Sequence, residues 1–184
     1  MSLICIGDSL TAGYGISKKD CWVSKLNENN FNFINKGVNG DTSIGILSRF
    51  FSDVIANNPE KCIIMCGTND IIMNKSVSTI IDNLNLMVKD LLSSKIVPII
   101  LSPPKIFKDL AIKYWSSNIN YDLVNLKLNQ LNEDLKIFCK KNNVLLISLF
   151  DLIPLNSIYY TDGIHLSYES NEVIYTKIKN RLAL

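Results

Sequence analysis

The stretch LICIGDSLTAGYG, residues 3–15, joins a short apolar run directly to a polar segment that contains three glycines. Four more apolar runs of similar length follow along the chain, at residues 31–34, 62–66, 96–101 and 144–149. Short, continuous apolar runs of this kind predict strands that are buried on both faces of a sheet. The chain therefore begins with one of five predicted strands.

Segments with helical spacing separate these strands. Apolar residues recur every three or four positions over residues 80–91 and 124–138, and a last amphipathic segment covers residues 173–182. The alternation of strands and helices predicts an α/β fold. In such a fold, right-handed crossovers connect the strands of a parallel sheet, and helices cover both of its faces. Residues 102–122 form one long irregular insertion, and such loops at the carboxyl ends of strands commonly build a ligand site.

The composition is typical of a globular protein, with 47% hydrophobic residues, 20% charged residues and a net charge of +2. The 184 residues contain no repeat, low-complexity tract or Gly/Ser/Pro-rich linker, which predicts a single domain over residues 1–184. The lysines are scattered and form no basic stripe, which argues against a nucleic-acid partner. No apolar run approaches the roughly 18 residues of a membrane-spanning helix.

The five cysteines are an odd number without the spacing of a metal site. Cys62 and Cys66 lie in one apolar segment, far in sequence from the only histidine. We therefore expect buried thiols in a reducing compartment and no bound metal. The first apolar run is also too short for a secretory signal, so the expected location is cytoplasmic.

Four polar motifs follow four of the predicted strands. They are GDSL at residues 7–10, GVNGDTS at 37–43, CGTND at 66–70 and DGIH at 162–165. The carboxyl ends of parallel strands lie on one edge of the sheet, so we expect these motifs to meet there.

Ser9, His165 and Asp162 have the residue types of a nucleophile, its general base and the acid that orients the base. A serine after a strand is most often a helix cap, and a lone histidine is most often structural. The three-residue spacing of Asp162 and His165, however, lets the carboxylate accept from Nδ1 and leaves Nε2 facing a hydroxyl.

Gly40 and Asn69 are candidates for stabilising the oxyanion that would form when Ser9 attacks an ester. A glycine lets its backbone N–H approach closely, and the Asn69 amide offers two donors without net charge. Either residue could instead have only a structural role in the turn that contains it. Asp8, Asp41 and Asp70 lie in the same motifs, and we interpret them as capping residues rather than catalytic ones.

In these four motifs the chain resembles the GDSL or SGNH hydrolases. The motifs occur in the same order as in that family and extend from Gly7 to His165. The resemblance implies a three-layer α/β/α, flavodoxin-like fold with a five-stranded parallel sheet and no metal or organic cofactor. It implies a catalytic triad of Ser9, Asp162 and His165, with an oxyanion hole formed by the backbone N–H groups of Ser9 and Gly40 and the Asn69 side chain. The chain is most similar to the bacterial arylesterase, lysophospholipase and acyl-thioesterase branch.

The resemblance further implies a small-molecule ester substrate, cleaved through an acyl-serine intermediate. In that branch the segment after the third motif forms part of the acyl pocket. In this chain that segment would be Ile71, Ile72 and Met73. These residues could equally begin the buried face of the next helix. Acyl chain length and oligomeric state depend on loops, at residues 102–122 and 152–160, whose shapes the sequence does not determine.

Two other functions are compatible with parts of this pattern. A carbohydrate acetyl esterase would use the same triad with a shallow, polar pocket beside Ser9. A flavodoxin-like binding module without catalysis would need no Asp162 and His165, and the chain lacks both GxxxxGK[ST] and GxGxxG phosphate-binding patterns. We therefore expect an enzyme that hydrolyses small or medium acyl esters.

Overall fold

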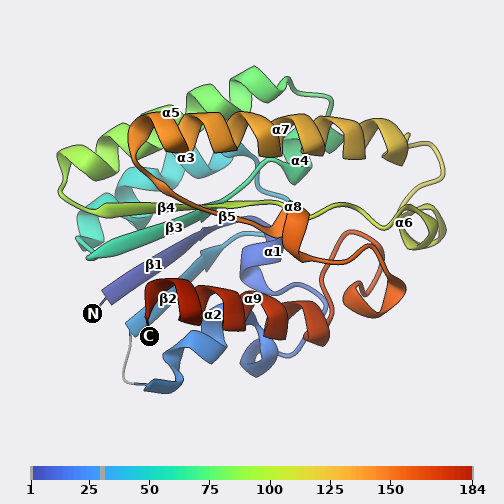
Figure 1. The fold of residues 1–184 in the computed structure, drawn as a ribbon, viewed down its shortest axis with the longest axis horizontal. Helices are drawn as coiled ribbons and strands as arrows, with labels where there is room; N and C mark the ends of the chain where they lie inside the picture. Colours follow the sequence, from blue (N-terminus) through green and yellow to red (C-terminus); the bar gives the residue numbers. More distant parts are fainter. Residues whose placement is uncertain (1, 30–31, 184) are drawn as a thin grey trace.

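The computed structural model describes residues 2–29 and 32–183 and contains a five-stranded, fully parallel sheet (Figure 1). The strand order is β2-β1-β3-β4-β5, which is the order of doubly wound, flavodoxin-like folds. The strands are β1 (Ser2–Gly7), β2 (Asn32–Gly37), β3 (Lys61–Met65), β4 (Val97–Ser102) and β5 (Leu145–Ser148). The predicted α/β class and parallel sheet are confirmed.

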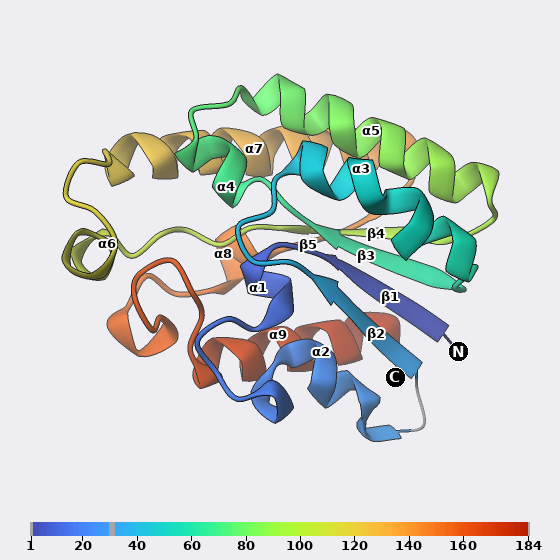
Figure 2. The same ribbon diagram turned by 180° about the vertical axis from the view of Figure 1, so that it is seen from behind.

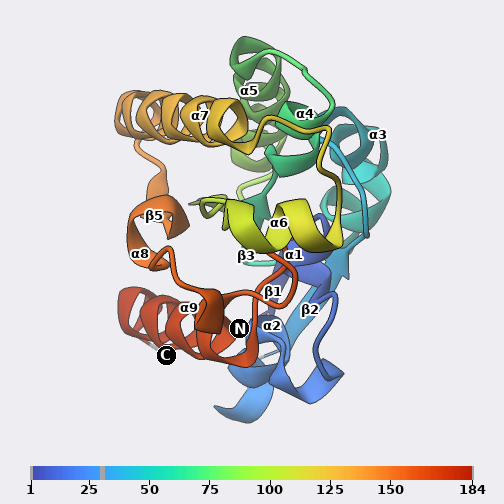
Figure 3. The ribbon, with the colours of Figure 1, turned by 90° about the vertical axis from the view of Figure 1, so that its right-hand side faces the viewer.

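Helices cover both faces of this sheet (Figures 1 and 2). One layer holds α3 (Ser43–Asp53), α4 (Thr68–Ile72), α5 (Val77–Ser93) and α7 (Tyr121–Asn142). The opposite layer holds α1 (Ser9–Ala12), α2 (Trp22–Lys25) and α9 (Tyr168–Leu182). Two further helices, α6 (Lys108–Tyr114) and α8 (Leu149–Leu152), lie near the carboxyl ends of the strands (Figure 3). The three α/β/α layers are those that the sequence predicted.

Alternation along the strands explains how one sheet supplies two cores. In β1, Ile4 and Ile6 pack with the layer of α3, α5 and α7, whereas Leu3 and Cys5 pack with the layer of α2 and α9. Successive side chains of a strand point to opposite faces, so a fully apolar run is needed where both faces are covered. The helix α5 meets the sheet with its apolar stripe, whose members are all buried: Ile80, Leu84, Met87, Val88 and Leu91.

Two predictions about the strands were wrong in detail. The second strand is β2 at Asn32–Gly37 rather than residues 31–34, and Phe31 lies outside the described residues. Neither β2 nor β5 is buried on both faces, because these two strands form the edges of the sheet and have a neighbour on one side only. Asn35 of β2 is accordingly exposed.

The segment at residues 102–122 is less irregular than predicted, because it contains the seven-residue helix α6. The helix packs its buried residue Ala111 against the turn at Gly163. Phe107, which precedes α6, donates its backbone N–H to the carbonyl of Gly163 over 2.8 Å. These contacts hold α6 beside the loop that carries His165. No helix among the described residues is long and apolar enough to cross a bilayer.

The close approach of β2 to α1 gives a prediction about stability. A Cβ on Gly37 would lie 2.7 Å from Ala12 Cα and 2.8 Å from the Thr11 carbonyl carbon, both backbone atoms that cannot yield. We expect Gly37→Ala to lower the free energy of unfolding by about 3 kcal/mol or more. Urea titration measures this change.

Gly40→Ala is the matched control for this substitution. A Cβ on Gly40 would meet nothing within 4 Å, so the variant carries only the strain of a positive φ of 76°, about 1 kcal/mol. A Gly37→Ala variant no less stable than Gly40→Ala would contradict the prediction.

Candidate active site

A tight turn from β1 into α1 places Ser9 at the carboxyl edge of the sheet. Asp8 caps α1 by accepting a hydrogen bond from the backbone N–H of Leu10 over 2.9 Å. Ser9 is the first residue of this four-residue helix, which ends at Gly13 in the left-handed region. A Cβ at Gly7 would overlap Thr11 and the carbonyl of Met65, so only glycine allows the strand to turn here.

A second turn, at residues 162–165, presents His165 to Ser9. Asp162 Oδ1 accepts the backbone N–H groups of Ile164 and His165 over 3.0 and 2.7 Å. Its other oxygen, Oδ2, lies 2.7 Å from His165 Nδ1. On the far side of the ring, Nε2 lies 2.9 Å from Ser9 Oγ. The structure thus brings together the three residues that the sequence proposed as a triad.

The environment of these groups suits proton transfer. Ser9 is 6% exposed and His165 is 4% exposed, so water competes little for their hydrogen bond. Burial alone would raise the pKa of Asp162, but hydrogen bonds from His165 and from the Trp115 side chain hold that pKa well below its ordinary value. The carboxylate is therefore ionised at neutral pH and fixes Nδ1 as the protonated nitrogen, leaving Nε2 to accept from Ser9.

Two aromatic rings flank the imidazole. The ring centroid of Tyr14 lies 4.3 Å from that of His165, and the centroid of Trp115 lies 5.4 Å from it. Neither aromatic residue was predicted from the sequence to belong to the site. Position in the chain was the available signal, because Tyr14 belongs to the first motif and Trp115 to the insertion at the carboxyl edge. Together they restrict the rotation of the His165 ring.

Gly40 and Asn69 line the same cavity as Ser9 and His165. Gly40 adopts a φ of 76°, which favours glycine. Asn69 Nδ2 donates to the backbone carbonyl of Asp41 over 2.8 Å, and it lies 3.5 Å from Asp8 Oδ2. One amide hydrogen therefore anchors the side chain, while the other has only a long contact.

The cavity beside Ser9 has a volume of about 280 Å³. Beyond the reacting groups its wall is largely apolar, formed by Ile72, Met73, Trp115, Ile119 and Ile164. Of the three predicted pocket residues, Ile72 and the exposed Met73 line this cavity. Ile71 does not, because it is 2% exposed and packs in the core between the sheet and α7. Ile119 and Ile164 were not predicted from the sequence.

The three acidic residues set aside as caps have different roles. Asp8 caps α1 as predicted. Asp41 accepts from the backbone N–H of Thr42 and forms an ion pair with Arg49. Asp70 lies inside α4 and accepts from both the backbone N–H and the hydroxyl of Ser43, over 2.9 and 2.6 Å. Asp70 is therefore not the N-cap of its own helix, but it binds the first backbone N–H of α3 and ties α4 to the start of α3, whereas the N-cap of α3 is Thr42 rather than Asp41.

The pKa of Asp8 is also shifted from its ordinary value. The side chain is 1% exposed, and burial raises its pKa to about 7, with further contributions from the charges of Asp70 and Asp41. The Leu10 N–H and the nearby His165 oppose this rise. Within residues 2–29 and 32–183, no group of three His, Cys, Asp or Glu side chains is placed to hold a metal ion.

Comparison with protein families identifies one family that matches most of the chain. Residues 5–173 match the GDSL-like lipase/acylhydrolase family. The comparison with curated proteins gave no match.

Several solved structures share the fold over nearly the whole chain. A member of the lipolytic protein G-D-S-L family from Veillonella parvula is 24% identical, with a TM-score of 0.83 and coverage of 100% of this chain and 98% of that one. The aryl esterase of M. smegmatis is 17% identical, with a TM-score of 0.84 and coverage of 99% and 98%. Est24, a carbohydrate acetylesterase from Sinorhizobium meliloti, is 18% identical, with a TM-score of 0.80 and coverage of 99% and 98%.

The titration of Asp8 predicts a pH-dependent stability. Its folded-state pKa of about 7 exceeds the ordinary value of 3.8, so the folded chain keeps a proton that the unfolded chain has lost. The free energy of unfolding should therefore fall as the pH rises from about 4 to about 7. The side chain of Asp8→Asn does not titrate, so the parent chain's stability relative to this variant should be about 3 kcal/mol greater at pH 5 than at pH 8.

Urea titrations of both proteins at the two pH values measure this difference. A relative stability that is equal at both pH values, or greater at pH 8, would show that Asp8 does not hold its proton in the folded chain.

Proposed function

Because the chain belongs to the GDSL-like lipase/acylhydrolase family, whose members hydrolyse ester bonds, we propose that it is a serine esterase in which Ser9 is the nucleophile. In this proposal His165 is the general base, and Asp162 orients it. The observation that carries the proposal is the continuous hydrogen-bond chain from Asp162 through His165 to Ser9 at the wall of a cavity.

The reaction begins when Ser9 Oγ attacks the ester carbonyl while His165 Nε2 takes its proton. The carbonyl oxygen becomes an anion, which is met by the backbone N–H groups of Ser9 and Gly40 and by the Asn69 amide. His165 then gives the proton to the departing alkoxide, leaving an acyl group on Ser9. Water, deprotonated by His165, attacks this acyl-serine, and His165 returns the proton to Ser9 Oγ as the carboxylic acid is released.

The geometry of Asn69 supports its place in the oxyanion hole. Its bond to the Asp41 carbonyl fixes the amide plane before substrate arrives. The second hydrogen is left with only the 3.5 Å contact to Asp8, so it can turn to an oxyanion without losing a good hydrogen bond. A donor that is already in place costs no reorganisation during the reaction.

The cavity supports small or medium acyl esters as substrates. Its volume of about 280 Å³ lies just below the usual range of small-molecule sites, which begins at about 300 Å³. The apolar wall of Ile72, Met73 and Ile119 suits an alkyl chain better than a sugar ring, which would need several polar partners. We therefore favour acyl esters over acetylated carbohydrates.

The same proposal includes two expectations from the sequence. One is that residues 1–184 form a single domain, which the two cores on either side of one sheet support. The other is a cytoplasmic location. All five cysteines lie in the described part of the chain and are buried and unpaired, which suits a reducing compartment.

Replacement of Ser9 tests the nucleophile. Ser9→Ala should lower kcat for p-nitrophenyl acetate by on the order of 10⁴-fold or more, because no hydroxyl remains to form the acyl-enzyme. Its circular dichroism should match that of the parent chain. Hydrolysis at the parent rate by a folded Ser9→Ala protein would exclude Ser9 as nucleophile.

Acyl-chain preference tests the substrate class. Each methylene buried against the apolar wall contributes about 0.8 kcal/mol, so kcat/KM should rise up to about tenfold from p-nitrophenyl acetate to the butyrate. Acetylated xylose should be a poorer substrate than either ester. A higher kcat/KM for acetylated xylose than for the butyrate would favour the carbohydrate esterase.

Ile119→Trp shows whether this wall binds the chain. The larger ring should fill the cavity and reduce kcat/KM for the butyrate by at least about tenfold, with little change for the acetate. Leu126→Trp is the matched control, because Leu126 is exposed and lies outside the cavity wall. Equal effects of the two variants on the butyrate would place the acyl chain elsewhere.

A further inference from the structure

We propose that Arg49 is a positioning residue for the oxyanion hole, because its guanidinium joins the chain segments that carry the hole's donors. The inference rests on the proposed function, since it concerns the same three donors. Arg49 lies on α3 and does not line the cavity, so it acts through other groups rather than on the substrate.

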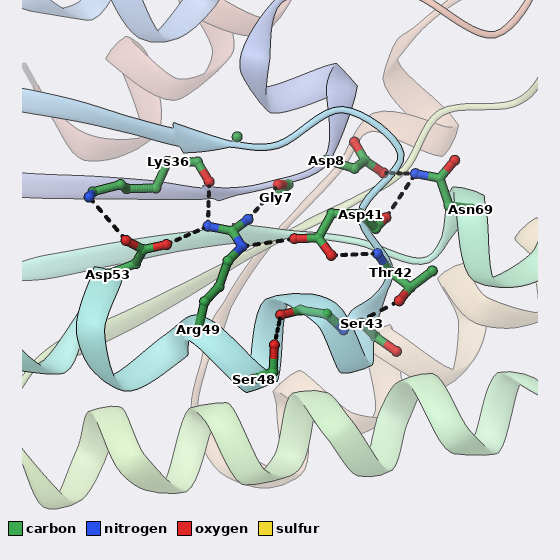
Figure 4. A network of polar contacts seen from close by, with 12 residues as sticks. Gly7, Asp8, Lys36, Asp41, Thr42, Ser43, Ser48, Arg49, Asp53 and Asn69 are labelled. Atoms are coloured by element: carbon green, nitrogen blue, oxygen red, sulfur yellow. Dashed lines mark hydrogen bonds and ion pairs between the residues drawn. The ribbon is translucent and has the colours of Figure 1, made fainter.

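The guanidinium of Arg49 donates hydrogen bonds to four acceptors (Figure 4). Its Nε donates to Asp41 Oδ2 over 2.8 Å, and its Nη2 donates to the backbone carbonyl of Gly7 over 3.1 Å. Its Nη1 donates to the backbone carbonyl of Lys36 over 2.9 Å and to Asp53 Oδ2 over 2.7 Å. One side chain thus joins the ends of β1 and β2, the loop after β2, and α3.

Each of the first three contacts lies close to an oxyanion donor. The carbonyl of Gly7 is two residues before the backbone N–H of Ser9, at the end of the strand that leads into the nucleophile. The Lys36 carbonyl and the Asp41 carboxylate lie on either side of Gly40 along the chain. Arg49 therefore holds both ends of the segment that presents the Gly40 N–H.

The third donor is reached through Asp41. The carboxylate of Asp41 binds Arg49 and the Thr42 N–H, which fixes the orientation of this residue. Its backbone carbonyl then accepts from Asn69 Nδ2 over 2.8 Å. Figure 4 shows the line of contacts from Arg49 through Asp41 to Asn69. Displacement of Asp41 would therefore move the Asn69 amide as well.

The glycine at position 45 supports this role of Asp41. Gly45 lies in the first turn of α3, where glycine is a poor helix former. A Cβ at this position would overlap Asp41 Oδ1. The missing side chain thus makes room for the carboxylate against α3, in reach of Arg49.

Arginine suits this position better than lysine does. Its planar group presents five N–H donors in a fixed geometry, and here they serve four acceptors in different directions. Asp53 holds the outer side of the group. Burial raises the pKa of Asp53, but hydrogen bonds from Arg49 and Lys36 outweigh that effect and hold its pKa below the ordinary value. A lysine ammonium at position 49 could keep the charge but not all the contacts.

The experiment measures kcat and KM for p-nitrophenyl acetate in Arg49→Lys, Arg49→Gln and Asp41→Asn. We expect each substitution to lower kcat by about 10- to 100-fold with KM changed less than about threefold, because the donors are misplaced for the transition state but the acyl pocket is intact. Inactivation by diethyl p-nitrophenyl phosphate, whose phosphoryl oxygen occupies the same hole, should slow by a similar factor.

Asp53→Asn is the matched control, since it removes the ion pairs of Arg49 and Lys36 on the side away from the site. It should keep kcat within about threefold of the parent chain. An equal loss of kcat in Asp53→Asn would overturn the proposal, because general destabilisation would then explain every variant. Retention of kcat within threefold by either Arg49 variant, or a change confined to KM, would also overturn it. If both Arg49 variants fail to fold, the kcat of Asp41→Asn decides alone.

The parent chain separates this inference from the proposed function. A parent chain that neither turns over the ester nor forms a phosphoryl adduct on Ser9 would refute the proposed function, and the role of Arg49 with it. A reactive parent chain whose Arg49 and Asp41 variants react equally well would refute the role of Arg49 alone.

Discussion

The hydrogen bond between Ser9 Oγ and His165 Nε2 joins residues 156 positions apart, and the rest of the site depends on it. It forms because every strand of the sheet is parallel, so all strands end on one edge. Gly7, at the end of β1, pairs in register with Gly37 of β2 and Met65 of β3, which brings the loops after three strands together. The turn at Asp162 and the packing of α6 on Gly163 then carry His165 to the same edge from the other end of the chain.

The two sides of Ser9 are held by different physical means. On the histidine side, an ionised and partly buried carboxylate orients the ring, and Tyr14 and Trp115 flank it. On the side of the proposed oxyanion hole, backbone carbonyls and carboxylates accept from Asn69 and Arg49, which fixes these two side chains without a substrate. In the proposed mechanism, both arrangements reduce the reorganisation that the reaction needs, which is the usual source of electrostatic catalysis.

Much of this arrangement could be predicted from local patterns. The apolar runs of β1, β3 and β4 indicated a sheet covered on both faces, and the three-residue spacing of Asp162 and His165 indicated their contact. The errors have physical causes. The edge strands β2 and β5 have one neighbour, so fewer of their side chains are buried, and the pattern of β2 is also more polar. Ile71 and Ile72 are adjacent in sequence, but Ile71 packs in the core and Ile72 lines the cavity, because successive residues of a helix lie about 100° apart. Trp115 and Ile119 lie in the insertion that the sequence marked as a candidate ligand loop, but their contacts with the site depend on a loop shape that the sequence does not determine. Arg49 contacts residues distant in sequence, for which its own neighbourhood gives no signal.

The protonation of the His165 ring tests the central claim most directly. His165 is the only histidine, so nitrogen NMR signals of an imidazole in the labelled protein belong to it without further assignment. At a pH at which the ring is neutral, we expect the proton on Nδ1, with an Nε2 signal that shifts when Ser9 is replaced by alanine. A neutral ring protonated on Nε2, or nitrogen signals that do not respond to the loss of the Ser9 hydroxyl, would contradict it.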